Sequence, residues 1–437
     1  FPDGSSLTFY RDLDKTCASI ASLNARDAEQ YHRFVTLWGK FNEPVYATFL
    51  APPRMDAMLG SIVRRKWSQL RSFMGLGKSA DLLKAIFGSY IQLIDTWFED
   101  ERLKAALAWF AAQSGTGPDE PGGGEMLAWQ ILGHQTGVWR PRGGSGMLSQ
   151  ALAGCLEYHG GAVRVSAPVA EIVTSGGRAT GVRLASGEVI HARCVISNAH
   201  VQTTLLDLIG ADKLDPTLVH QLRHLRIADG MGMTIRCAAD ALPNYAALPM
   251  QDGQPNASHQ GMQLICPSVD YLRRAYHESQ LGRPASAPAI LGMTPTSTDP
   301  SLAPAGKHIF NVWAQWHPYT LEDGLDWDDI RQREAEKLLR IMDDYAPGFT
   351  SQITGTYIKT PVDLERIGGL VRGNLMHIDM TLDQMFMFRP LPDLANYATP
   401  IDGLWLTGAS THPGGGVSGA PGYITAHEVL RHWKKMR

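Results

Sequence analysis

The stretch GLWLTGASTHPGGGVSGAPG, residues 403–422, joins a short apolar run to a dense set of glycines. The run 404–406 predicts a buried strand, and the apolar spacing after Gly422 predicts a helix over 423–433. Such a strand, loop and helix bring backbone N–H groups close to a phosphate or an anionic ring. A turn that needs glycine only for its backbone angles is the alternative. Six glycines between residues 408 and 422 favour close approach to a ligand.

The composition excludes several classes of protein. The chain has 437 residues, enough for two domains, with 44% hydrophobic and 19% charged residues. A net charge of -3 and the lack of a Lys/Arg-rich run give no electrostatic footprint for nucleic acid. No apolar segment reaches the roughly 18 residues that a membrane-spanning helix needs.

The cysteines and the first residues bear on the compartment. The five cysteines are dispersed and none forms C-x-x-C, which argues against a disulfide framework and a cysteine-based metal site. We therefore expect no metal, a reducing compartment and a cytoplasmic location. The chain begins at Phe1 rather than Met, without the basic start and apolar core of a signal peptide. We expect it to begin inside a longer unit.

Residues 75–79 resemble the end of a phosphate-loop motif but do not complete it. GLGKS has the terminal glycine, lysine and serine, but Ser72 occupies the position of the first glycine and no apolar strand precedes it. The lysine and serine fit the start of a helix over residues 79–98, with Ser79 as the N-cap. The broad apolar stripe of that helix favours core packing over a pocket wall or contact with a membrane surface.

A second glycine turn, residues 139–147, opens a helix predicted over 147–158. After this helix the spacing of apolar residues becomes that of short strands, which are separated by the hairpin turns Gly176-Gly177 and Ser186-Gly187. We expect a β-meander and a further buried strand. The predicted strands are 162–165, 169–174, 179–184, 188–191 and 194–197. Further along, we expect a strand over 309–316 and a helix over 327–344.

The motifs in this order resemble the phytoene-desaturase-like family of FAD oxidoreductases, and within it the pyridine nucleotide-disulfide oxidoreductase domain-containing protein 2 branch. The resemblance covers essentially the whole chain. Besides residues 403–422, the motifs that carry it are Trp97-Phe98-Glu99, 299–304, 345–349, 361–365, Gly373-Asn374, Leu382-Asp383-Gln384, Arg389-Pro390 and 412–417.

The resemblance implies an α/β fold with α+β elements. A discontinuous Rossmann-like FAD-binding domain accompanies a substrate domain made of a mixed sheet and helices. On this map, residues 140–200, which include the meander, and the C-terminal segment 402–437 form the FAD-binding domain. Residues 1–139 form a mainly helical substrate or lid region, and 201–401 form the substrate domain.

One expected motif is absent. The family begins with a strand, a G-x-G-x-x-G loop and a helix that hold the FAD pyrophosphate, and this sequence contains no such unit. Three explanations stay open: the unit is cleaved or left out of this sequence, it belongs to a separate N-terminal chain or subunit, or it has been lost. The third would leave two glycine turns without their ligand.

The resemblance also assigns cofactor-binding positions. Gly415, Gly416 and Val417 would approach the isoalloxazine ring, with the helix near Gly419 meeting the negative charge of the reduced ring. Gly408 and Ala409 would lie near the pyrophosphate and ribityl chain. Val169 would contact the adenine side through its backbone, and Gly143 and Gly144 would lie by the ring.

Candidates for catalysis come from the block 373–390 and from the glycine loop. They are His377, Gln384, Arg389 and His412. Each also has a structural interpretation: His377 as a hydrogen-bonded strand histidine, Arg389 as a brace paired with a carboxylate. The nearby set of methionines and phenylalanines, Met376, Met380, Met385, Phe386, Met387 and Phe388, predicts either core packing or a pocket for an apolar substrate.

The sequence therefore predicts an FAD-dependent oxidoreductase, a dehydrogenase, desaturase or oxidase, acting on a hydrophobic or moderately polar small molecule. FAD is the expected cofactor, and no motif indicates NAD(P) as electron acceptor. The alternative is a non-catalytic member that uses the fold as a binding or regulatory subunit. Contact with a membrane has no support in the sequence.

Overall fold

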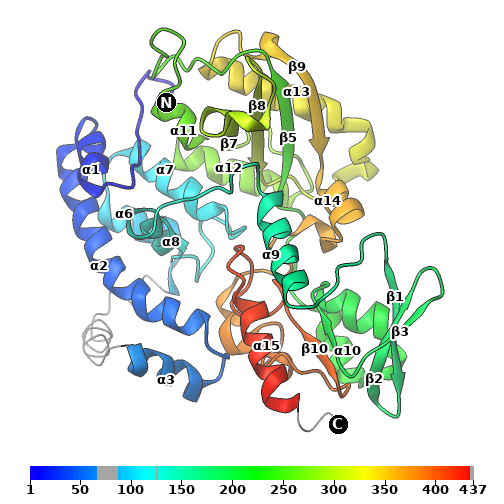
Figure 1. The fold of residues 1–437 in the computed structure, drawn as a ribbon. Helices are drawn as coiled ribbons and strands as arrows, with labels where there is room; N and C mark the ends of the chain where they lie inside the picture. Colours follow the sequence, from blue (N-terminus) through cyan, green and yellow to red (C-terminus); the bar gives the residue numbers. More distant parts are fainter. Residues whose placement is uncertain (66–86, 125, 434–437) are drawn as a thin grey trace. The chain divides into compact units, whose positions relative to one another are not determined.

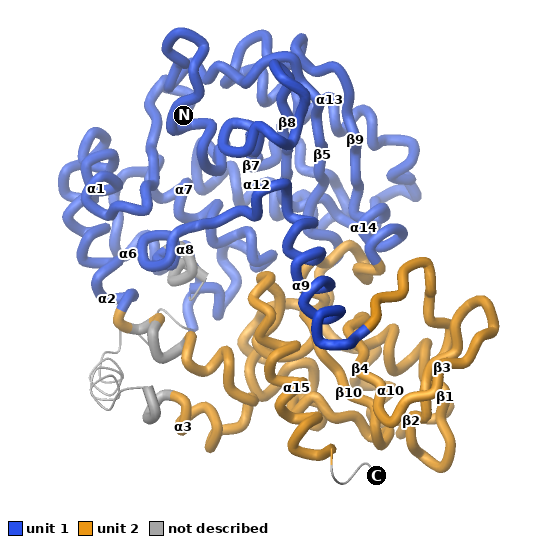
Figure 2. Tube along the Cα trace, viewed as in Figure 1, with its two compact units in different colours: residues 1–39, 80–161, 229–368 blue, residues 40–79, 162–228, 369–437 orange. Residues whose placement is uncertain are grey.

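The computed structural model describes residues 1–65, 87–124 and 126–433, which form two units (Figures 1 and 2). Unit 1 comprises residues 1–39, 80–161 and 229–368, and unit 2 comprises residues 40–79, 162–228 and 369–437. The predicted α/β class is confirmed, since helices and sheets occur in both units. Residues 140–161, mapped above to the FAD-binding domain, belong to unit 1, and residues 162–200 belong to unit 2.

Most helices lie in unit 1. Its helices are α1 Leu13–Ala21, α6 Tyr90–Trp97, α7 Glu101–Ala112, α8 Met126–Gln135, α9 Gly146–Tyr158, α11 Ala257–Gln260, α12 Val269–Gln280, α13 Trp327–Tyr345 and α14 Pro361–Gly368. Helix α2, Ala25–Phe49, begins in unit 1. Unit 2 contains α3 Met55–Arg65, the π-helix Thr203–Gly210, α10 Pro216–Arg223 and α15 Ala420–His432.

The strands form three sheets. Unit 1 has an antiparallel sheet in the order β6-β7-β8-β5-β9, made of Met262–Ile265, Ile290–Met293, His308–Gln315, Gly232–Ala239 and Ile353–Lys359. Unit 2 has the antiparallel meander β1-β2-β3, made of Val169–Ser175, Arg178–Leu184 and Val189–His191. It also has a parallel pair, β4 Val195–Ser197 with β10 Leu404–Leu406.

Helix α13 packs on the sheet of unit 1 (Figure 1). Met233 and Ile235 of β5 and Phe310 of β8 belong to the same buried cluster as Leu338 and Met342 of α13. The alternation of buried residues along β5 and the three- and four-residue spacing along α13 produce these two apolar faces. Helix α7 is joined to the sheet by Trp109, whose Nε1 donates to the Ile290 carbonyl at 3.1 Å.

Strand β10 is buried on both faces. Leu404 and Leu406 lie in a cluster with the meander residue Ile172 and the π-helix, and Trp405 lies in a second cluster with Ile424 and Val429 of α15. Burial on both faces is typical of a parallel strand, and it explains the continuous apolar run Leu-Trp-Leu. The structure thereby confirms the predicted strand, loop and helix at residues 403–433, with α15 starting at Ala420 instead of residue 423.

Two sequence predictions differ from the structure. Residues 162–165, predicted as a strand, make no strand pairing, although the four other predicted strands of this region are present. A strand needs a partner for its backbone groups, and none of the described segments supplies one here. The helix predicted over residues 79–98 is interrupted at residues 88–89, and α6 begins after the N-cap Ser89 and spans Tyr90–Trp97. Residues 79–86, like the rejected motif at 75–79, lie outside the described residues.

Within the residues that the structure describes, no helix is long and apolar enough to cross a membrane. The same residues contain no group of three or more His, Cys, Asp and Glu side chains that could bind a metal ion.

Candidate functional site

The site in unit 2 begins where the parallel strands β4 and β10 end. Thr407 N–H donates to the Ser197 carbonyl at 2.9 Å and extends the pairing by one residue. The chain then turns at Gly408, which has φ +82°. A Cβ at Gly408 would lie 1.9 Å from Asn198 Oδ1, just beyond β4, so any larger residue would have to displace the Asn198 side chain as well as adopt a left-handed backbone. The carboxyl ends of two parallel strands are therefore adjacent, the place where open α/β sheets bind ligands.

The glycines of the loop divide into two groups. A Cβ at Gly414 would approach the Arg389 guanidinium at 3.3 Å, and one at Gly415 would lie 2.6 Å from Met376 Sδ. These two glycines allow the block 376–389 to pack against the loop. A Cβ at Gly416, Gly419 or Gly422 would meet nothing within 4 Å. Packing against the protein does not explain the second group, which leaves an open surface.

Backbone strain lies at the same place. Val417 has φ +54° and its side chain is 89% exposed. A β-branched residue in the left-handed region is a genuine outlier, and such strain gathers at ligand sites.

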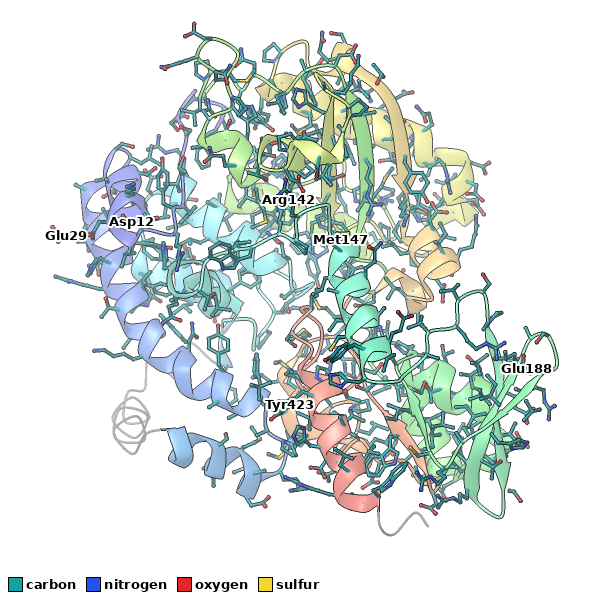
Figure 3. All side chains as sticks on the ribbon, viewed as in Figure 1. Asp12, Glu29, Arg142, Met147, Glu188 and Tyr423 are labelled. Atoms are coloured by element: carbon teal, nitrogen blue, oxygen red, sulfur yellow. The ribbon has the colours of Figure 1, made fainter. Side chains whose placement is uncertain are left out.

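The start of α15 completes the open surface. Gly419, with φ +69°, is the N-cap and offers no side chain to the first turn, and Pro421 fits the first positions of the helix. Gly416, Val417 and Ser418 donate no backbone hydrogen bond to any described residue. Tyr423, labelled in Figure 3, lies on the first turn with an exposed side chain. Free N–H groups at a helix N-terminus favour a bound negative charge.

Arg389 is fully buried behind the loop. Its guanidinium donates to the carbonyls of Ala409 at 2.6 and 3.0 Å, Met376 at 2.7 Å, Ile378 at 3.2 Å, and Asp379 and Gln384 at 3.1 Å. Burial lowers the pKa of Arg389 to about 9, which leaves it protonated at neutral pH. The sequence allowed a brace paired with a carboxylate; the hydrogen bonds of the guanidinium go to backbone carbonyls instead.

Gln384 has a scaffolding role of the same kind. Its side chain accepts from the Arg226 N–H at 2.9 Å and donates to the Arg226 carbonyl at 3.0 Å. The residue is buried, and its amide oxygen and nitrogen are both used within the protein.

His412 is also buried, against the aromatic rings of Phe49 and Phe386. Its Nε2 lies 3.2 Å from the Thr48 carbonyl, and the phenol of Tyr397 donates to the His412 carbonyl at 2.9 Å. Nδ1 has no partner among the described residues. Burial lowers the pKa of His412 to about 4, so the imidazole is neutral at pH 7.

His377 is half-buried and reaches the loop. Its Nδ1 lies 2.9 Å from Ser410 Oγ, and the His200 ring nitrogen Nε2 lies 3.1 Å from the His377 carbonyl. Burial, with the nearby imidazole of His200 next in weight, lowers the pKa of His377 to about 4. Ser410 and His200 were not singled out in the sequence. Their positions were the available signal: His200 follows β4 by three residues and Ser410 follows β10 by four. Because these two strands pair in parallel, residues just after their ends lie close together.

The remaining predicted positions belong to other elements of the chain. Val169 begins β1, paired with Leu184 of β2. Gly143 and Gly144 belong to unit 1, in the turn between Arg142 and Met147 at the start of α9 (Figure 3). The Gly143 N–H donates to Asp299 Oδ2 at 2.6 Å. The structure thus brings Gly408, Ala409, Gly415, Gly416 and Val417 together with the four catalytic candidates inside unit 2.

Comparisons with known proteins indicate a flavin-dependent oxidoreductase family. A model of the flavin-containing amine oxidoreductase family matches residues 64–236. The chain is 35% identical to pyridine nucleotide-disulfide oxidoreductase domain-containing protein 2 of Rattus norvegicus, over 99% of this chain and 77% of that protein. It is 28% identical to the lycopene-forming phytoene desaturase of Pseudescherichia vulneris, over 95% and 78% of the two chains.

A solved structure supports the fold. An oxidoreductase from Methanosarcina mazei matches with a TM-score of 0.51 and 18% identity, over 78% of this chain and 68% of that one. At this identity the likeness concerns the fold alone.

The open surface fits a flavin. Gly416, Gly419 and Gly422 leave room for a planar ring, and the free N–H groups at the start of α15 suit its negative charge after reduction.

Replacing Gly408 with alanine tests the turn after β10. Gly408→Ala places a methyl group against Asn198 in a left-handed conformation, and we expect the free energy of unfolding to fall by about 2–4 kcal/mol. Gly176→Ala is the matched control, because Gly176 also has positive φ but open surroundings; we expect it to lose only about 1 kcal/mol. Urea unfolding of both variants measures the difference, and equal losses would contradict the close contact.

The buried imidazole of His412 predicts acid sensitivity. Since its folded pKa, about 4, is below the ordinary 6.5, the unfolded chain binds the proton more tightly. Stability from this residue is complete above pH 6.5 and is lost as pH falls toward 4, by about 3 kcal/mol. His412→Gln cannot titrate at this position. We expect the variant to be less stable than the wild type at pH 7, and the difference in their free energies of unfolding to shrink as the pH falls from 6.5 toward 4. Urea titrations at several pH values check this; a constant deficit would contradict a neutral buried imidazole.

Proposed function

This chain belongs to the phytoene-desaturase-like family of FAD-dependent oxidoreductases, and on that premise we propose that it removes hydride from a hydrophobic organic substrate. The observation that carries the proposal is the open loop Gly416–Gly419 with its free N–H groups, at the carboxyl ends of two parallel strands. Bound FAD would supply the hydride acceptor. Gly416, Val417 and Ser418 would hold the ring and stabilise its added charge.

The surroundings of the loop favour an apolar substrate. Of the predicted methionine and phenylalanine set, Met380 and Met385 are buried and serve packing. Met376, Phe386 and Met387 are half-buried, and Phe388 is exposed. Met376 lies against Gly415, so a soft apolar surface adjoins the proposed ring position. Neutral His377 and His412 add no formal charge at pH 7.

We further propose that the FAD site is completed by a β-strand that pairs with β4. Among the described strands β4 pairs only with β10, and a two-stranded parallel sheet is unusual because such sheets are normally extended and covered. Ile196 in the middle of β4 is 47% exposed. A strand on this edge would cover Ile196 and place its own following loop beside Gly408.

A second segment of unit 2 supports an additional strand. Residues 162–165 have the alternation of a strand without a partner, and Val165 is 82% exposed. The segment that would satisfy these features is a strand, G-x-G-x-x-G loop and helix, on the same polypeptide or on a separate chain. Its loop would hold the FAD pyrophosphate.

Amide hydrogen exchange tests the added strand. We expect residues 195–197 and 162–165 to exchange at least about tenfold more slowly when the G-x-G-x-x-G segment of a relative is supplied, because their backbone groups become paired. The edge strand β6 of unit 1 is the internal control and should not change. Equal exchange with and without the segment, at saturating concentration, would contradict the proposal.

Anaerobic reduction of the FAD-loaded protein tests the substrate class. We expect a long-chain unsaturated hydrocarbon to bleach the flavin absorbance at least about tenfold faster than the primary amine of the same carbon number, because the surface at Met376 is apolar. Faster bleaching by the amine would overturn the apolar assignment. A protein that binds FAD but is reduced by no substrate of either class would support the non-catalytic alternative.

A further inference from the structure

His377 occupies a strained backbone turn. Its φ is +67°, and the N–H of Ile378 donates to the carbonyl of Met376 at 2.9 Å. A hydrogen bond between residues on either side of one residue with positive φ defines the rare, strained form of the γ-turn. Glycine would adopt this conformation at lower cost than histidine. The imidazole is therefore present despite the strain, and the surroundings must hold the turn in place.

Three consecutive carbonyls of the turn are held from outside it. Arg389 Nη2 donates to the carbonyl of Met376 at 2.7 Å and to that of Ile378 at 3.2 Å. His200 Nε2 lies 3.1 Å from the carbonyl between them, that of His377. Because Arg389 is fully buried and directs its remaining N–H groups to other carbonyls, it cannot follow a relaxation of the turn.

The hydrogen bonds also assign the tautomers of both imidazoles. The Gln202 N–H donates to His200 Nδ1 at 3.1 Å, so the proton of a neutral His200 lies on Nε2 and is donated to the His377 carbonyl. Ser410 Oγ accepts from the Val201 N–H at 3.1 Å and has one proton to donate. Its acceptor is His377 Nδ1 at 2.9 Å. The proton of a neutral His377 is then on Nε2.

The turn is locked to the glycine loop. Ser410 belongs to the loop itself, and Arg389 holds the neighbouring Ala409 carbonyl as well as the turn. Met376, the residue before His377, packs against Gly415. The backbone and Nδ1 of His377 are thus fully used, whereas its Nε2 has no partner among the described residues.

We propose that His377 donates its Nε2–H to an oxygen or nitrogen atom of the molecule bound on the glycine loop, and that Ser410, His200 and Arg389 are the residues that position it. This inference rests on the proposed function. A strained residue held by several independent contacts, with one polar atom left free, is typical of a preorganised ligand contact. The acceptor is an oxygen or nitrogen atom of the flavin ring, which gains negative charge when it takes up the hydride.

The tautomer can be tested without any ligand. We expect the ring-nitrogen NMR signals of His377, identified by their absence in His377→Gln, to show the proton on Nε2. Ser410→Ala removes the donor to Nδ1, and we expect the proton to redistribute between the two nitrogens. A proton on Nδ1 in the wild-type protein, or no change in Ser410→Ala, would overturn the assignment of the donor.

The ligand contact is tested with the FAD-loaded protein. We expect His377→Phe to slow flavin reduction by roughly tenfold to hundredfold, and His377→Gln, which keeps a donor near Nε2, to recover most of the rate. His191→Phe is the control, because His191 is an exposed histidine on β3 of the same unit. We expect this variant to leave the rate of flavin reduction unchanged. Equal rates for wild type and His377→Phe, or equal losses in the Phe and Gln variants, would overturn the proposal.

The same variants test the acceptor. A changed absorption spectrum and reduction potential of substrate-free His377→Phe would support a hydrogen bond to the flavin. An unchanged spectrum and an unchanged potential would overturn that assignment. A wild-type protein that binds no FAD in the presence of the phosphate-binding segment would contradict the proposed function itself. If the wild type binds FAD and is reduced normally, and His377→Phe shows the same spectrum and the same reduction rate, only the present inference is contradicted.

Discussion

The charge of Arg389 is the constraint on which the geometry of the site depends. A guanidinium removed from water needs partners for its five N–H groups, because an unpaired buried charge costs several kcal/mol. Here backbone carbonyls supply those partners, from the turn at His377 and from Ala409 before the glycine loop. Two segments that are distant in sequence are thereby held as one body. The arginine is a structural cation, and its guanidinium lies so near Gly414 that a Cβ added there would be only 3.3 Å from it.

The local parts of the fold could be predicted because their signals are local. The apolar run at Leu404–Leu406 and the glycines after it specify a strand and a loop from sequence alone, and the turn at Gly176 specifies a hairpin. The role of Arg389 could not be predicted in the same way. Its acceptors are carbonyl groups, which every residue carries, so no pattern of side chains reveals them. The same holds for Gln384, whose partner is the backbone of Arg226.

The strand predicted at residues 162–165, which does not form, shows a second limit of prediction from sequence. The alternation of Val163 and Val165 is a property of the sequence, but a strand exists only where another backbone accepts and donates its hydrogen bonds. The absent pairing there and the single partner of β4 among the described strands are the observations behind the strand that we propose for this edge. The sequence lacks the phosphate-binding motif, and Ile196 on β4 is exposed.

The first half of the glycine loop, residues 408–415, is held by the protein, and the second half, residues 416–419, is open. At Gly408, Gly414 and Gly415 an added Cβ would press against side chains behind the loop, and the loop backbone is held there by Arg389. At Gly416 and Gly419 an added Cβ would meet no protein atom within 4 Å, and the N–H groups of residues 416–418 have no acceptor among the described residues. A donor surface that is fixed from behind loses little conformational entropy when a charged ring binds in front of it. The strain at His377 can persist because Arg389 and His200 hold the carbonyls of its turn, so this residue keeps its orientation before any ligand arrives.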